Sequence, residues 1–318
     1  MRVLRLIAGL AIGLASHTYA ASFAYITNQA DNSVSVVDLP TQQVVATIQV
    51  GKAPVGVAID DVQNRVYISN VEGRSVSVID MLTQTLLHEI PLEIAPVGLA
   101  LSKSGSVLFV ADWFHDQVLL VDTNQFSVTG SIAMGRAPAG MAVSREGATL
   151  YVANRDSDDV GVIDVRSRQV VSKIAVGKHP FGITLGGDGR HLYVVNVESN
   201  SLTMIDVRSD IVVATISVGD HPYCVTSNTD GSRVYVTNTA DDTVSVVDTK
   251  TRTVIATIPV DATPEGIAFD SKQQRVYVAS WMDNRVSVID AQNNTRIHSI
   301  PTGQNSRSFG QFIGHPIP

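Results

Sequence analysis

The strongest constraint on the fold is an internal repeat of 42 residues that occurs seven times without insertion or deletion. Such a period indicates a repeat architecture, and seven continuous copies leave no room for a linker or a second domain. In each copy an aspartate ends an alternating apolar run and an aromatic residue opens another short run. The aspartates are Asp38, Asp80, Asp122, Asp164, Asp206, Asp248 and Asp290, and the aromatic residues are Tyr25, Tyr67, Phe109, Tyr151, Tyr193, Tyr235 and Tyr277.

Each copy contains four short strand signals separated by turn residues. Residues 234–237, 244–247, 254–258 and 266–269 are examples of the four, and they are rich in β-branched and aromatic side chains. Pairs such as Asp230-Gly231 favour tight turns between them. Four antiparallel strands in a unit of this length form the blade of a β-propeller. The sequence therefore predicts an all-β fold, a single seven-bladed β-propeller of four-stranded antiparallel blades.

The strand that follows a recurrent proline is predicted to be the innermost one. Small residues alternate there, as in Gly56 and Ala58, because sheets that converge on an axis approach closely only where side chains are small. Cys224, the single cysteine, takes a glycine position in this pattern. The first repeat begins at its second strand, at Ala24, and residues 306–313 fall in the inner-strand register. We therefore expect the C-terminal strand to join blade one and close the ring without a free edge.

The second strand of most copies opens with YVTN or a close variant, as at residues 151–154 and 235–238. In this motif the chain resembles the YVTN-type β-propeller repeat family, and the resemblance extends over residues 24–317. It implies relatives among surface-layer, periplasmic and quinoprotein-associated propellers of bacteria and archaea, and it implies no shared catalytic residues. Departures from the motif occur at residues 109–112 (FVAD) and 277–280 (YVAS).

Residues 1–20 are predicted to be a secretory signal peptide, and residues 21–318 the propeller. A basic stretch with two arginines precedes an apolar run, and residues 18–20 (TYA) supply a small-residue cleavage site. The apolar run is too short to span a bilayer. A permanent N-terminal anchor is the less favoured alternative. We expect a periplasmic or secreted protein with no membrane span after cleavage.

Charge and cysteine content limit the kinds of partner and of covalent chemistry that can be expected. The chain has 23 basic and 30 acidic side chains, a net charge of −7 that becomes −9 without the two arginines of residues 1–20. An acidic chain without a Lys/Arg run is not expected to bind nucleic acid generally. A single cysteine cannot form an internal disulfide. No catalytic arrangement of Ser, His, Cys and Asp can be proposed, and we predict no cofactor.

Function is expected where the copies diverge on one rim, because a feature shared by all seven is explained by the blade. The shared aspartates, for example, are expected to accept backbone N–H groups in polar turns. His179 and His221 occupy one register in adjacent copies, but two imidazoles without a third ligand predict no metal site. Rings folded onto the blades, or drift among repeats, are the alternatives to a binding surface. The predicted surface consists of Trp113, Phe114, His115, His179, Phe181, His221, Tyr223, Glu265, Trp281 and Arg307.

Two classes of function remain open at this stage. The first is a non-catalytic binding or scaffold protein that holds a protein or peptide on this irregular rim, whose aromatic and charged composition is that of an interface hot spot. The second is an enzyme, or a dehydrogenase-associated propeller subunit, with an active site at the channel mouth. A cell-surface or adhesive role is a third, weaker candidate. The fold cannot choose among them, because propellers host all of these functions.

Overall fold

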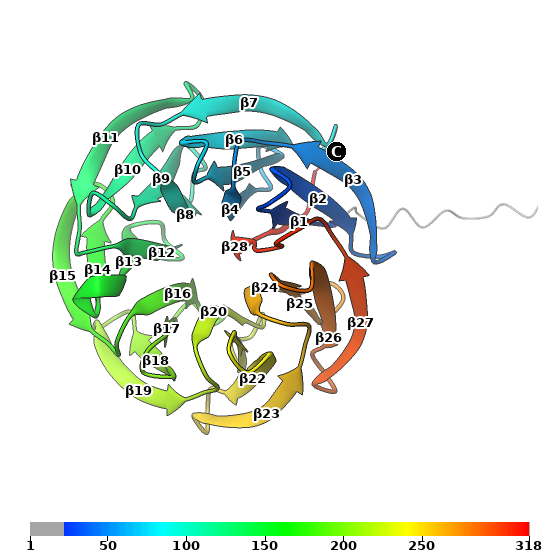
Figure 1. Cartoon of the computed structure of the whole chain (residues 1–318). Helices are drawn as coiled ribbons and strands as arrows, with labels where there is room; N and C mark the ends of the chain where they lie inside the picture. The colour runs from blue at the N-terminus through cyan, green and yellow to red at the C-terminus, as the bar shows by residue number, and fades with distance from the viewer. Residues whose placement is uncertain (1–21, 318) are drawn as a thin grey trace, which may run out of the picture.

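The computed structural model describes residues 22–317, whose strands form seven sheets around a central axis (Figure 1). This confirms the predicted all-β seven-bladed propeller. The predicted signal peptide, residues 1–20, lies outside the described residues, as does residue 318. Within the described part, the one short helix is the 3₁₀ turn η1 (Arg155–Ser157). No helix in residues 22–317 is long and apolar enough to cross a membrane.

Six sheets have four strands, and the sheet of blade two has a fifth strand beside its innermost one. Blades one to four consist, from the axis outward, of β29 (Ile313–Gly314), β1 (Phe23–Asn28), β2 (Ser33–Asp38) and β3 (Gln43–Gln49); β4 (Pro54–Asp60), β5 (Arg65–Asn70), β6 (Ser75–Asp80) and β7 (Thr85–Pro91); β8 (Pro96–Leu101), β9 (Val107–Asp112), β10 (Gln117–Asp122) and β11 (Ser127–Ala133); and β12 (Pro138–Val143), β13 (Thr149–Asn154), β14 (Asp159–Asp164) and β15 (Gln169–Ala175). Blades five to seven consist of β16 (Pro180–Leu185), β17 (His191–Asn196), β18 (Ser201–Asp206) and β19 (Ile211–Ser217); β20 (Pro222–Ser227), β21 (Arg233–Asn238), β22 (Thr243–Asp248) and β23 (Thr253–Pro259); and β24 (Pro264–Asp270), β25 (Arg275–Ser280), β26 (Arg285–Asp290) and β27 (Thr295–Pro301). The additional strand beside β4 is β28 (Phe309–Gly310).

The core lies between neighbouring blades, where the two middle strands of each sheet are almost wholly buried on both faces. Strands covered on both faces are expected to be continuous runs of β-branched and aromatic residues, which is what the repeat supplies. The outermost strand is mainly exposed and buries one isoleucine per blade, for example Ile48 and Ile300. The aromatic residue of the repeat is fully or almost fully buried in every blade.

Glycines on the innermost strands set how closely the blades approach. A Cβ on Gly56 would lie 2.2 Å from the carbonyl oxygen of Val97, and a Cβ on Gly98 would lie 2.0 Å from that of Ala139. Neither distance is compatible with a side chain, because the next blade's backbone already occupies the space. The expectation that small residues mark the innermost strand is therefore confirmed.

The third residue of the YVTN motif connects neighbouring blades where it carries a hydroxyl. Thr237 accepts a hydrogen bond from the backbone N–H of Cys224 in its own blade (2.9 Å) and donates to the backbone carbonyl of Glu265 in the next (3.1 Å). Ser69 makes the same bridge from Gly56 to Val97. These bonds satisfy backbone groups that would otherwise be buried without a partner.

The C-terminal segment closes the ring as predicted. Arg307 donates its backbone N–H to Thr27 at 3.0 Å, Phe312 accepts from the N–H of Tyr25 at 2.8 Å, and β29 pairs antiparallel with β1. Between these points the segment leaves β1, and β28 pairs with β4 in the parallel direction. Gly310 turns the chain here at a φ of 110°, which is open to glycine but costly for other residues.

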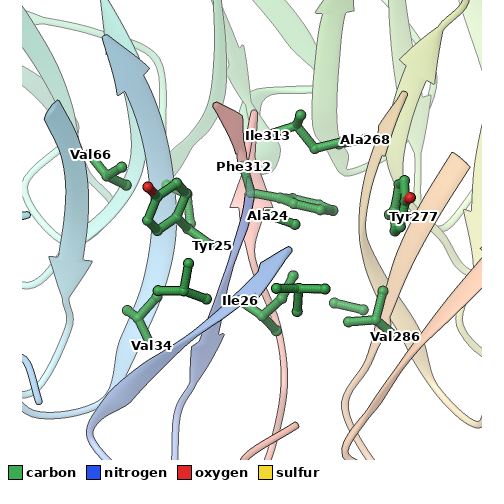
Figure 2. Packing of buried hydrophobic residues seen from close by; sticks show 14 of the residues in the cluster. Ala24, Tyr25, Ile26, Val34, Val66, Ala268, Tyr277, Val286, Phe312 and Ile313 are labelled. Atoms are coloured by element: carbon green, nitrogen blue, oxygen red, sulfur yellow. The ribbon is translucent and has the colours of Figure 1, made fainter. Parts of the chain in front are cut away.

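Phe312 fills the junction between the first and last blades. Its ring is fully buried in one cluster with Ala24 and Ile26 of β1 and Tyr277 of β25 (Figure 2). The C-terminal segment therefore contributes apolar packing to the core as well as backbone hydrogen bonds.

Conserved polar positions within the repeat hold turns, as expected. Asp248, for example, accepts from the backbone N–H of Thr251 at 2.7 Å and from its hydroxyl at 3.0 Å. These two bonds lower the pKa of Asp248. The remaining six aspartates accept backbone N–H groups in the same way.

The asparagine of the motif is paired in space with a glycine in the loop that leads to its own blade's inner strand. Asn196 donates to Ser201 and Thr203 on the next strand and accepts from the N–H of Gly177 at 3.1 Å. A Cβ on Gly177 would lie 2.7 Å from Asn196 Cγ. The same pairs recur as Asn28 with Gly303, Asn70 with Gly51, Asn154 with Gly135, and Asn238 with Gly219.

The two departures from the motif occur in the two copies that lack this glycine. In blade seven Ser280 replaces the asparagine and Asp261 replaces the glycine, and the Ser280 hydroxyl donates to the Asp261 backbone carbonyl at 2.9 Å. In blade three Asp112 and Glu93 stand at these positions. A shorter or charged side chain at one position thus accompanies a larger residue at the other.

Candidate functional site at the channel mouth

In six of the seven blades the loop before the inner strand keeps one backbone conformation although its side chains differ; Ala95 in blade three is the exception. His179 and His221 both adopt the left-handed conformation, at φ of 52° and 49°, as do Ala53, Ala137 and Thr263 at equivalent positions. In His179 the backbone N–H is held by Asp158 Oδ1 at 2.9 Å, and in His221 by Asn200 Oδ1 at 3.1 Å. The scaffold thus fixes the loop, and its side chains are free to differ between copies.

An aromatic cluster packs at the channel mouth on this rim, in one buried cluster with Val55 and Ala139 of other inner strands. Phe181 is only 5% exposed, and its ring centroid lies 4.3 Å from that of Tyr223 and 5.8 Å from that of Trp113, the latter in an edge-on arrangement. Its third neighbour is Phe309 of β28, at 4.8 Å. Such aromatic contacts are favourable beyond the area they bury. Phe181, Tyr223 and Trp113, predicted from three different copies, are thus brought together.

Phe309 belongs to this cluster but was missed by the sequence argument. In the repeat alignment it takes a position that is aliphatic in every other copy, from Val57 to Ile267. The one aromatic residue at this otherwise aliphatic position could have identified Phe309 from the sequence.

An ion pair completes the mouth beside the aromatic cluster. Arg307 donates through Nε and Nη2 to the carboxylate of Glu265, through Nη2 to Tyr223 Oη at 2.9 Å, and through Nη1 to Gln29 Oε1 at 3.3 Å. Trp281 Nε1 donates to the same Gln29 oxygen at 3.3 Å. Burial raises the pKa of Glu265, against the opposing effect of the Arg307 charge. Gln29, also missed from sequence, thus joins two of the predicted residues.

The four remaining predicted residues stand apart from this centre. His179 Nδ1 lies 2.7 Å from Glu198 Oε1, and His221 Nδ1 lies 2.9 Å from Asp220 Oδ1, so each imidazole faces a carboxylate. In the part of the chain that the structure describes, no group of three or more His, Cys, Asp or Glu side chains could hold a metal ion. His115 contacts the buried carboxylate of Asp112 at 2.8 Å with most of its side chain exposed.

Phe114, the fourth, is 69% exposed, and it has an unpredicted counterpart in the equivalent loop of blade seven. There Met282, which follows Trp281 as Phe114 follows Trp113, is 63% exposed. The Trp113 ring carries the guanidinium of Arg155 at 5.3 Å from its centroid, a cation–π contact that sequence reasoning also missed. The rim thus presents two exposed apolar side chains, each beside a tryptophan that is partly buried and held in place.

Comparisons with known proteins agree on the propeller. Residues 184–275 match the family model of the YNCE-like beta-propeller, and residues 121–217 match that of the lactonase, 7-bladed beta-propeller. No curated protein matches the sequence. Each family model covers less than half of the chain, and both describe a β-propeller.

Solved structures resemble the chain over most of its length. Hydrazine synthase of Kuenenia stuttgartiensis has a TM-score of 0.76 at 22% identity, with 83% of this chain and 91% of that one covered. A functionally unknown protein from Desulfotomaculum acetoxidans has a TM-score of 0.80 at 14% identity, with 93% and 99% covered. At these identities the likeness extends to the fold alone.

Proposed function

We propose that this chain is an exported, non-catalytic binding propeller of the YVTN type that holds a protein or peptide partner on its channel-mouth rim. The observation that carries the proposal is that two exposed apolar side chains, Phe114 and Met282, each follow a partly buried tryptophan that is held by other contacts. A partner that covers these side chains would remove apolar surface from water, and the Met282 loop is already held by the hydrogen bond from the Trp281 N–H to the Thr263 carbonyl oxygen at 2.9 Å. Preorganised aromatic anchors of this kind dominate the energetics of protein interfaces.

The centre of the rim supports the same proposal. The aromatic cluster around Phe181 packs with Val55, Ala139 and Phe309 of other inner strands. The hydrogen-bonding groups of Arg307 are largely engaged by Glu265, Tyr223 and Gln29. A rim packed in this way offers a platform for a macromolecule and little depth for a small substrate. Export is supported by the signal-peptide pattern of residues 1–20.

A site-specific photo-crosslinker tests the proposal. Benzoyl-phenylalanine in place of Phe114, introduced in the source organism, is expected to trap a discrete protein adduct on irradiation. The same substitution at Lys103, an exposed residue near the opposite end of the inner strands, is expected to trap none. Adding Met282→Ser and Trp113→Ala to the first variant should weaken binding by about 1–3 kcal/mol and remove most of the adduct. Trapping at position 103 and not at position 114 would show that the interface lies on the opposite rim and would contradict the proposal.

A second candidate is hydrolysis of a lactone, because residues 121–217, which include His179 and Phe181, match a family model named for lactonases. Opening a lactone releases a proton, so a pH indicator assay with a panel of lactones tests this candidate directly. Turnover at the rate of buffer alone would reject it. A propeller subunit of an enzyme complex is the remaining form of this alternative, and it rests on the likeness in fold to a chain of hydrazine synthase.

A further inference from the structure

The central channel contains a cavity of about 320 Å³ beneath the aromatic cluster. Phe309 is shared between the cluster and the cavity wall, so it separates the channel mouth from the space below. The remaining wall comes from the middle and later parts of the inner strands, so the cavity lies toward the opposite rim. Four of the wall segments are residues 57–59, 98–101, 140–143 and 182–185.

The wall of this cavity is apolar and uncharged. Among the described residues that form it, none has an ionisable carboxylate, ammonium or guanidinium group, and the polar side chains are those of Thr184, Cys224 and Gln311. Hydrogen-bonding groups are nevertheless present, because β8, β12, β16, β20 and β24 each end their sheet. Those N–H and C=O groups of these edge strands that point away from the neighbouring strand of their sheet face the axis.

A second hollow of about 300 Å³ continues from the cavity at the opposite rim. It shares Thr184, Leu185 and Gln311 with the cavity, so the two are contiguous. Its own contribution is neutral and rich in hydroxyl groups, together with one aromatic ring. The added side chains are those of Thr226, Ser227, Asn228, Thr229, Phe269 and Ser271.

We propose that the channel is a binding site for an uncharged small amphiphile that enters from the rim opposite the aromatic cluster. The apolar body of the ligand would occupy the cavity, and a hydroxyl or amide group would lie among Thr184, Thr226 and Gln311. The cavity volume of about 320 Å³ lies at the lower end of the range for small-molecule sites, about 300–1,000 Å³. A charged ligand would lose hydration without gaining a counter-charge, which is strongly unfavourable. This site is separate from the proposed protein-binding rim.

Binding is tested with N-phenyl-1-naphthylamine, an uncharged fluorophore whose emission rises in apolar surroundings. The intact mature protein should bind it saturably with one site per chain. Gln311 is exposed at the junction of the two hollows, so Gln311→Trp should obstruct entry and weaken binding at least tenfold without lowering Tm. Gln304→Trp, the same change at an exposed position on the channel-mouth rim, should leave binding unchanged.

Cys224 provides an independent measure because it is the single cysteine and lies in the cavity wall. Burial raises the pKa of its thiol, so the reaction with methyl methanethiosulfonate is followed by mass spectrometry at pH 8.5. Saturating fluorophore and Gln311→Trp should each slow this modification at least tenfold. The proposal is overturned by the absence of saturable binding, by equal effects of the two tryptophan variants, or by modification of Cys224 that the bound fluorophore does not slow.

Discussion

Arg307, in the segment that closes the ring, donates two hydrogen bonds from its guanidinium group to the carboxylate of Glu265. Glu265 stands at the equivalent position of the preceding copy, 42 residues earlier. In five of the seven copies this position holds Val55, Val97, Ala139, Phe181 or Tyr223. The two charged members are therefore neighbours around the ring, and each supplies the counter-charge of the other. This pair joins the last blade to the first at the channel mouth.

Removing one charge of this pair should destabilise the protein. Glu265→Ala leaves the largely buried guanidinium of Arg307 without its carboxylate, at a cost of roughly 3 kcal/mol in the free energy of unfolding. The double variant Glu265→Leu/Arg307→Met should be less destabilised than Glu265→Ala, because neither charge is then buried alone. Urea unfolding of the variants measures both values. A double variant that is at least as destabilised as Glu265→Ala would contradict the pairing.

The closing strand should depend on Phe312. Phe312→Ala removes a fully buried ring from the junction of the first and last blades and should cost about 3–5 kcal/mol. Ile317→Ala, in the same tail, removes a side chain from a residue that is 56% exposed and should change stability by less than about 0.5 kcal/mol. Thermal unfolding of both variants tests the prediction. Equal melting temperatures would show that the segment does not contribute to the core.

The Asn–Gly pairing should appear as coupling between two positions. Gly177→Ala places a Cβ against Asn196 Cγ and should cost about 1–3 kcal/mol. Asn196→Ser loses hydrogen bonds but makes room for that Cβ, as Ser280 does beside Asp261 in blade seven. The double variant should therefore be more stable than the sum of the single effects predicts, by at least about 0.5 kcal/mol. Strict additivity in a double-mutant cycle would refute the steric explanation.

The turn aspartates should make the protein sensitive to acid. Hydrogen bonds from the following turn lower the pKa of Asp164, Asp248 and Asp290. Because the folded-state pKa is below the unfolded value of about 3.9, their stabilisation is complete above that value and is lost as pH falls through the folded-state pKa. The triple Asp→Asn variant cannot lose it by protonation. Its Tm should therefore decline less than that of the unaltered protein between pH 5 and pH 2, and parallel declines would contradict the prediction.

The fold could be predicted from the sequence because a propeller repeats one local pattern. Strand alternation, turn residues and the glycines of the inner strand recur every 42 residues, so seven copies report the same blade. The closing strand followed from the register of residues 306–313. The irregular course of residues 309–311, where the chain pairs with β4, could not be predicted, because it depends on contacts with a strand some 250 residues away.

The arrangement of side chains at the channel mouth could be predicted only in part from the sequence. Divergence among the copies located Phe181, Tyr223, Glu265 and Arg307 on one rim, because equivalent positions in a closed ring must face each other. Their hydrogen bonds, the part played by Gln29, and the exposure of Phe114 and Met282 depend on side-chain orientation around the axis. The separation of the mouth from the cavity below was likewise decided by the tertiary structure, because one residue, Phe309 of β28, contacts rings contributed by other blades.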